Sequence, residues 1–135
     1  MPKPKSINKE FLELSKSLDV KKFSESVRGT FHDFIDYRHE GKIFYPAWYI
    51  ILGALSGYLA GCDTLQDIAV FMKVKNQWFA ELLHTPVKAP SYNVIWMFFA
   101  CTAPNEFKKI LKQWFSLLPE ELRSQLLVLD GKRIK

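Results

Sequence analysis

The uncharged stretch IFYPAWYIILGALSGYLAG, residues 43–61, decides which kind of fold this chain adopts. Nineteen residues without a charge approach the length of a membrane span. Pro46 near its start, scattered aromatic and small residues, and flanking charges of both signs favour a buried core helix instead. Pro46 suits the first turn of that helix and Gly61 its end. Gly53, Gly57 and Gly61 recur every four residues, which would let another helix approach closely.

Length and composition predict one folded domain with a packed core. The chain has 135 residues, of which 48% are hydrophobic and 15% aromatic, and this composition excludes global disorder. The net charge of +5 is uneven, because lysines gather in residues 1–22 and 108–135 while residues 43–104 are neutral. A basic surplus of this kind favours contact with nucleic acid or another anionic surface.

The cysteines and histidines show no pattern that would hold a metal. Cys62 and Cys101 are far apart in the sequence, and neither they nor the three histidines have the spacing of metal ligands. We interpret the cysteines as two buried thiols in a reducing cytoplasm. Residues 1–20 contain no secretory signal, so we expect a cytoplasmic protein. We also expect it to bind no cofactor and no small-molecule substrate, and not to associate with a membrane.

Hydrophobic periodicity predicts a compact all-α bundle of about six or seven helices. Ser24, Thr64 and Ser91 are the expected N-caps of three of them, and Asp67 adds a capping-box-like arrangement to Thr64. The helix over 92–101 is apolar all round, so we expect it at the centre of the bundle. The other expected helices cover about 7–18, the residues after Ser24, 46–61, 64–72, 77–84 and 104–118.

The helices over 64–72, 77–84 and 91–101 have the outline of a helix-turn-helix. A helix that reads bases presents Arg, Lys, Asn or Gln, whereas the third helix offers only Asn93. The sequence of these three helices is compatible with direct reading of DNA bases and also with packing in the core alone. On the helix over 104–118 the lysines either meet phosphates or form a solvated face. The candidate nucleic-acid contacts are Lys73, Lys75, Asn76, Gln77, Lys108, Lys109 and Lys112.

The run Leu126–Leu129 is predicted to be a short buried strand that ends at Asp130 and a turn glycine. A strand with a carboxylate at its end is typical of the start of an α/β catalytic domain. Two-metal phosphoryl transfer needs several oxygen ligands, and one carboxylate cannot supply them. We therefore expect a helical domain over 1–124, a first strand of a truncated catalytic domain over 125–135, no metal site and no catalysis.

Several short runs along the chain carry a family resemblance: Asp36-Tyr37-Arg38 with Lys42, 51–52 through 59–61, 64–69 with Phe71, 89–91, 103–107 with Trp114, and 128–132. In their order and spacing, the chain resembles the N-terminal region of a DDE-type insertion-sequence transposase, of the H-repeat-associated type. The resemblance implies an accessory, DNA-engaging helical module that precedes a ribonuclease-H-like catalytic domain. It also implies that Asp130 corresponds to the first catalytic acid, with Mg²⁺ bound only in a full-length relative.

Four functions follow as alternatives. The first is a truncated transposase module that binds double-stranded DNA or a full-length transposase and does not catalyse recombination itself. The second is an interaction module that forms oligomers through the glycine repeat and does not bind DNA. A small membrane protein that uses residues 43–61 and an active nuclease that uses Asp130 are the other two.

Overall fold

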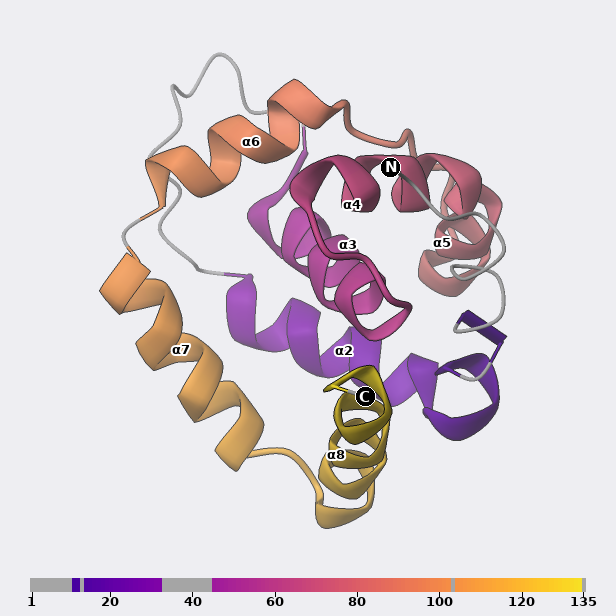
Figure 1. Cartoon of the computed structure of the whole chain (residues 1–135), viewed down its shortest axis with the longest axis vertical. Helices are drawn as coiled ribbons and strands as arrows, with labels where there is room; N and C mark the ends of the chain where they lie inside the picture. The colour runs from indigo at the N-terminus through magenta and orange to yellow at the C-terminus, as the bar shows by residue number, and fades with distance from the viewer. Residues whose placement is uncertain (1–10, 13, 33–44, 103, 135) are drawn as a thin grey trace.

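Helix α3, Ala47–Leu59, is the central helix of the structure. The structure is a computed structural model that describes residues 11–12, 14–32, 45–102 and 104–134. Figure 1 shows α3 in the middle of the molecule, and α2, α4, α6 and α8 all contact it. Ile50, Ile51 and Leu52 are fully buried. The uncharged stretch is therefore a core helix, and within the described ranges no helix combines the length and apolar character that crossing a membrane requires.

The other helices surround α3, and the described part of the chain contains no strand. Their bounds are α2 Val20–Phe31, α4 Leu65–Val74, α5 Asn76–Leu83, α6 Tyr92–Cys101, α7 Pro104–Ser116 and α8 Glu120–Ile134. Residues 11–12 and 14–17 are also helical. The predicted helix over 7–18 lies partly outside the described residues, and the motif around Asp36 with Lys42 lies wholly outside them.

Two of the three predicted N-caps are confirmed. The Thr64 hydroxyl accepts a hydrogen bond from the backbone N–H of Asp67 (3.0 Å), and the Ser91 hydroxyl accepts one from Val94 (3.3 Å). The prediction for Ser24 is wrong, because α2 already begins after Asp19, whose carboxylate accepts from the Lys22 N–H at 3.2 Å. An aspartate satisfies the free N–H groups of a first turn at least as well as a serine does.

The glycine repeat of α3 is covered by α4 of the same chain. A Cβ atom built on Gly53 would lie 2.3 Å from both Sδ and Cε of Met72, and one on Gly57 would lie 3.2 Å from Ile68. The absence of these Cβ atoms lets the two helices approach closely. The close approach expected from the repeat therefore takes place within the chain, and these two glycines are not available to a second copy.

The predicted strand over Leu126–Leu129 is wrong, because these residues belong to α8. Leu122, Leu126 and Leu129 are buried, whereas Leu127 and Val128 are 56% and 54% exposed. Burial at i, i+4 and i+7 is the pattern of a helix packed on one side. A strand needs a neighbouring strand for its backbone hydrogen bonds, and the described residues provide none. A helix satisfies these groups internally, and α8 continues through residues 124 and 125 without interruption.

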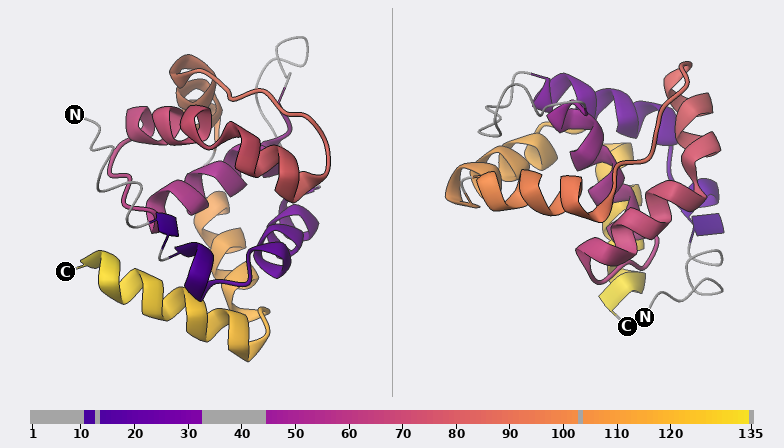
Figure 2. Two further views of the ribbon diagram at one scale, coloured as in Figure 1. Left: turned by 90° about the vertical axis from the view of Figure 1, so that its right-hand side faces the viewer. Right: turned by 90° about the horizontal axis from the view of Figure 1, so that it is seen from above.

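Helix α6 lies at the edge of the molecule and not at its centre, which corrects the expectation from its all-apolar sequence. Ile95 and Phe98 are fully buried, but Tyr92, Trp96 and Met97 are 43%, 49% and 48% exposed. Figure 2 shows α6 at the periphery in both views. Contacts with α4 and α3 cover only its inner side. Its outer side is therefore an apolar helix surface in contact with solvent.

Candidate nucleic-acid interface

Two of the candidate residues predicted around the α4–α5 junction line the same groove, and two do not. Lys73 and Asn76 line it. The Lys75 ammonium lies 4.3 Å from the centroid of the Phe11 ring, and Gln77 lies 3.5 Å from the Glu81 carboxylate, next to a different hollow. The groove therefore brings together only part of the predicted set.

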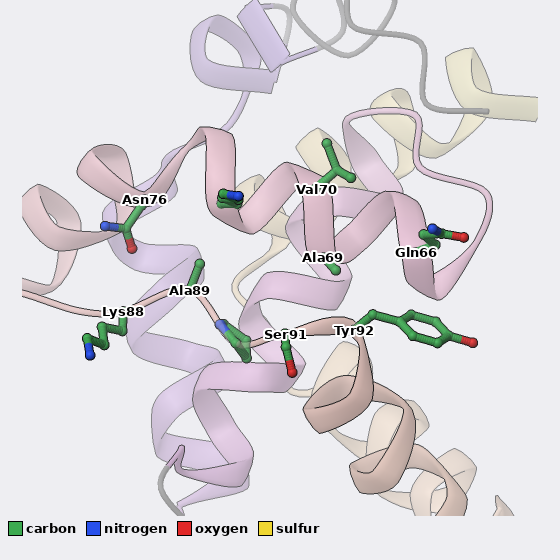
Figure 3. A pocket seen from close by; sticks show the side chains of 10 residues that line it. Gln66, Ala69, Val70, Asn76, Lys88, Ala89, Ser91 and Tyr92 are labelled. Atoms are coloured by element: carbon green, nitrogen blue, oxygen red, sulfur yellow. The ribbon is translucent and has the colours of Figure 1, made fainter.

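The groove runs between α4, the start of α5 and the segment that leads into α6 (Figure 3). Its volume is about 570 Å³. In Figure 3 the side chains from α4 and α5 lie on one side, and those of the segment 88–91 lie on the other. The residues that line this cationic groove are Gln66, Ala69, Val70, Lys73, Asn76, Lys88, Ala89, Pro90, Ser91 and Tyr92.

Local sequence explains why these elements leave a groove. Lys75 alone separates α4 from α5, so the two helices meet at a tight junction. After α5 the chain is extended over 86–91, as Figure 2 shows. Pro86 and Pro90 favour this extended backbone, because proline fixes φ and keeps the preceding residue out of the helical region. Ser91 then starts α6, with its first turn beside the groove.

The charge that faces the groove is positive. Lys73 from α4 and Lys88 from the extended segment are both exposed, and the described residues that line the groove include no Asp or Glu. The N-terminal end of α6 adds the positive end of a helix dipole. The nearby acid Asp67 already accepts a hydrogen bond from the backbone N–H of Asp63 at 3.1 Å. Oδ1 of Asn76 is buried without a hydrogen-bond partner.

Sequence reasoning did not identify four polar or aromatic residues of the groove, namely Gln66, Lys88, Ser91 as a lining residue, and Tyr92. One signal for Lys88 was present: it is the single cation in the proline-flanked segment before a serine-capped helix. Gln66 and Tyr92 carry no such local signal, because only the packing of α4 beside α6 brings them together.

The second predicted group, Lys108, Lys109 and Lys112, lies on α7 on the opposite side of the molecule from α5 (Figure 1). All three side chains are exposed. The apolar side of α7 is anchored elsewhere, since Trp114 is buried and its Nε1 donates to the Ser26 hydroxyl at 3.1 Å. These lysines therefore form a separate basic surface.

Asp130 lies in α8, where its carboxylate accepts a hydrogen bond from the Tyr58 hydroxyl at 2.8 Å. Nowhere in the described ranges do three His, Cys, Asp or Glu side chains gather in a way that could hold a metal ion. The described surroundings of Asp130 thus do not fit a two-metal site, which requires several carboxylate ligands. Cys62 is buried and Cys101 half-buried, and the two do not form a disulfide bond with each other.

A second hollow, of about 370 Å³, lies on the other side of Lys88, where the start of α3 faces the segment 85–88. We call it the aromatic pocket. Tyr49 is 3% exposed, and its hydroxyl is buried without a hydrogen-bond partner. Burial, followed by the neighbouring Tyr45, raises the pKa of Tyr49 to about 12. The pocket is lined by Tyr45, Pro46, Trp48, Tyr49, Leu83, Thr85, Pro86, Val87 and Lys88.

Tyr49→Phe is expected to raise the free energy of unfolding by about 1 kcal/mol at pH 8, because it removes a buried hydroxyl without a partner. The gain should grow above pH 10. There the unfolded state loses the tyrosine proton while the folded state, with its pKa of about 12, keeps it, so wild-type stability falls as pH rises. Urea unfolding at pH 8 and pH 11 measures both effects. Tyr92→Phe is the control at an exposed ring, and a destabilised Tyr49→Phe would show that the hydroxyl has a partner.

Comparison with known proteins gives one family. Residues 28–115 match the family model described as DDE_Tnp_1-associated, which covers well over half of the chain. No curated protein and no solved structure matches the chain. The cationic groove and the aromatic pocket lie within the matched residues, whereas α8 and Asp130 follow them.

Proposed function

The chain belongs to the DDE_Tnp_1-associated family, and from this we propose that it is a transposase-related module that binds the phosphate backbone of double-stranded DNA in the cationic groove. The observation that carries the proposal is the position of Lys73 and Lys88. They come from separate elements, and no carboxylate lines their shared groove in the part of the chain that the structure describes. Within the neutral middle of the sequence, folding thus gathers positive charge in one place.

The chemistry of the groove suits a phosphodiester. Two ammonium groups neutralise backbone phosphates as point charges, and their attraction does not depend on base sequence. Gln66 and the Ser91 hydroxyl add neutral hydrogen-bonding groups of the kind that contact phosphates and sugars. The proposed binding is therefore salt-dependent and weakly selective for sequence. The outer side of α6, with Trp96 and Met97 exposed, is mostly apolar, and the exposed Asn93 is its one side chain of a type that reads base edges.

The module, as we propose it, has no catalysis of its own. The acid that the resemblance relates to catalysis, Asp130, is hydrogen-bonded to Tyr58 in a helix. Chemistry on DNA would then belong to a catalytic domain with which the module works, and Mg²⁺ would bind there.

Lys73→Gln/Lys88→Gln is expected to weaken binding to a 20-base-pair duplex at least tenfold at 50 mM salt. Each lost phosphate contact should also reduce the slope of log K against log salt by about 1, so the double variant should lose about 2. Fluorescence anisotropy at 50 and 200 mM salt measures both quantities. Lys108→Gln/Lys112→Gln makes the same charge change on α7 and is expected to stay within about twofold of wild type. Equal losses in both variants, or no wild-type binding at 50 mM salt, would reject the groove as the site.

A second candidate function is an interaction with another copy or with a full-length transposase, favoured by the exposed Tyr92, Trp96 and Met97 on α6. A row of exposed aromatic and thioether side chains is characteristic of protein interfaces. This surface would replace the glycine repeat as the oligomerisation surface, since α4 covers Gly53 and Gly57. Sedimentation velocity of wild type and Trp96→Ala at high concentration separates a dimer from a monomer.

A further inference from the structure

The aromatic pocket is next to the cationic groove and has a different chemistry. Of the described residues, Lys88 alone lines both hollows, so it stands between them. Three aromatic side chains form one part of the wall: Trp48 and Tyr49 from the first turn of α3, and Tyr45 just before it. Pro86 and Val87 from the extended segment form another. A hollow of about 370 Å³ with such walls is within the usual size range of small-ligand sites.

Charge identifies the class of occupant. Lys88 lines the pocket with an exposed side chain, and Lys73 lies in the adjoining cationic groove. Among the residues that the structure describes, no Asp or Glu lines the aromatic pocket. Aromatic rings interleaved with cations are the recognition surface for single-stranded nucleic acid, where bases stack on the rings and phosphates meet the cations. A proline-rich peptide would also suit aromatic walls, but it does not account for Lys88 in the pocket and Lys73 in the adjoining groove.

The buried Tyr49 hydroxyl is a second observation that points to a ligand. The side chain is almost completely buried at the pocket wall, and its hydroxyl has no partner. A buried hydroxyl without a hydrogen bond costs stability. The ring nitrogens and carbonyl groups of a nucleobase are the polar atoms that would satisfy it.

We propose that the aromatic pocket accepts one unstacked nucleobase of a single-stranded or locally opened nucleic acid, while the adjoining phosphates lie against Lys88 and Lys73 in the cationic groove. The proposal rests on the nucleic-acid binding proposed above and adds a preference for opened over fully paired DNA. Because Lys88 adjoins both hollows, one strand can place a phosphate and the neighbouring base without a change of fold.

The test compares three probes that share the same phosphate chemistry: a ten-residue oligothymidylate, an abasic strand of equal length, and a duplex. Wild type should bind the oligothymidylate at least tenfold more tightly than the abasic strand, because stacking on an aromatic side chain contributes about this much per base. Trp48→Leu should remove most of that difference and leave affinity for the abasic strand and the duplex within twofold. Trp96→Leu, which removes an exposed indole from α6, is the matched control and should keep the difference.

A second variant guards against misfolding of Trp48→Leu. Val87→Trp fills the aromatic pocket from its opposite wall and keeps the three aromatic side chains in place. It should also abolish the preference for bases, and circular dichroism confirms that each variant is folded. The base pocket is overturned if wild type binds the oligothymidylate and the abasic strand equally, or if both folded variants keep the preference. It is likewise overturned if Val87→Trp blocks a proline-rich peptide but no oligonucleotide. These outcomes are separate from a failure of the groove, which would appear as a loss of duplex and abasic binding in wild type.

Discussion

Gly53→Leu is expected to lower the free energy of unfolding by about 3 kcal/mol, because it inserts a side chain where two helices are in contact. A Cβ atom at this position would already lie 2.3 Å from Sδ and Cε of Met72. Met72 is fully buried, so a shift of its side chain disturbs the packing of its neighbours. A leucine side chain at position 53 must therefore displace Met72 or push α4 away from α3. Urea unfolding followed by circular dichroism measures the loss.

Gly29→Leu is the matched control. Gly29 lies in α2, is exposed, and has no atom within 4 Å of a built Cβ. Replacement of glycine by leucine in an exposed helix is expected to stabilise the protein by several tenths of a kcal/mol. The two substitutions should thus shift stability in opposite directions. Equal stability of the two variants would contradict the close packing of α3 against α4.

Leu129→Ala is expected to lower the free energy of unfolding by about 3 kcal/mol, since it removes a buried side chain from the contact of α8 with the rest of the bundle. Leu129 is 3% exposed and Leu126 is 6% exposed, so Leu126→Ala should cost a similar amount. The neighbouring Leu127→Ala removes the same atoms from a side chain that is 56% exposed and should cost less than about 1 kcal/mol. Thermal and urea unfolding of these variants measure the difference.

The pattern of these losses distinguishes a helix from a strand. If Leu126–Leu129 formed a strand buried on both faces, alanine at any of the four positions would lower the free energy of unfolding strongly. If the strand were buried on one face, the losses would be similar at alternate positions. The helix predicts large losses in the free energy of unfolding for alanine at Leu126 and Leu129, and small losses at Leu127 and Val128. A large loss at Val128→Ala together with a small one at Leu129→Ala would contradict α8.

Local signals in the sequence predicted those parts of the fold that depend on local chemistry. The hydroxyls of Thr64 and Ser91 cap the helices that follow them, and the uncharged stretch became the core helix α3. The run Leu126–Leu129 could not be assigned in this way, because four successive apolar residues suit a buried strand and a half-buried helix equally. The position of α6 was also beyond local reasoning, since an apolar sequence does not reveal which side its neighbours leave uncovered.

The candidate site was predictable only in part, for the same reason. Lys73 and Asn76 stood out as polar residues at the junction of two helices, but Lys75 and Gln77 had the same signal and lie outside the groove. Lys88 completes the groove from a segment that is distant in the sequence from α4. Which cations share a surface depends on tertiary packing, and periodicity within single helices does not contain that information.

The most direct test of nucleic-acid binding in the groove is a titration of the ¹⁵N-labelled protein with a short DNA duplex, followed by amide chemical shifts. Binding in the cationic groove predicts that the largest changes occur at Lys73, Asn76, Lys88 and Tyr92, and that they disappear at high salt. The amides of 108–112 on α7 should change little. Changes confined to α7, or none at 50 mM salt, would contradict the account.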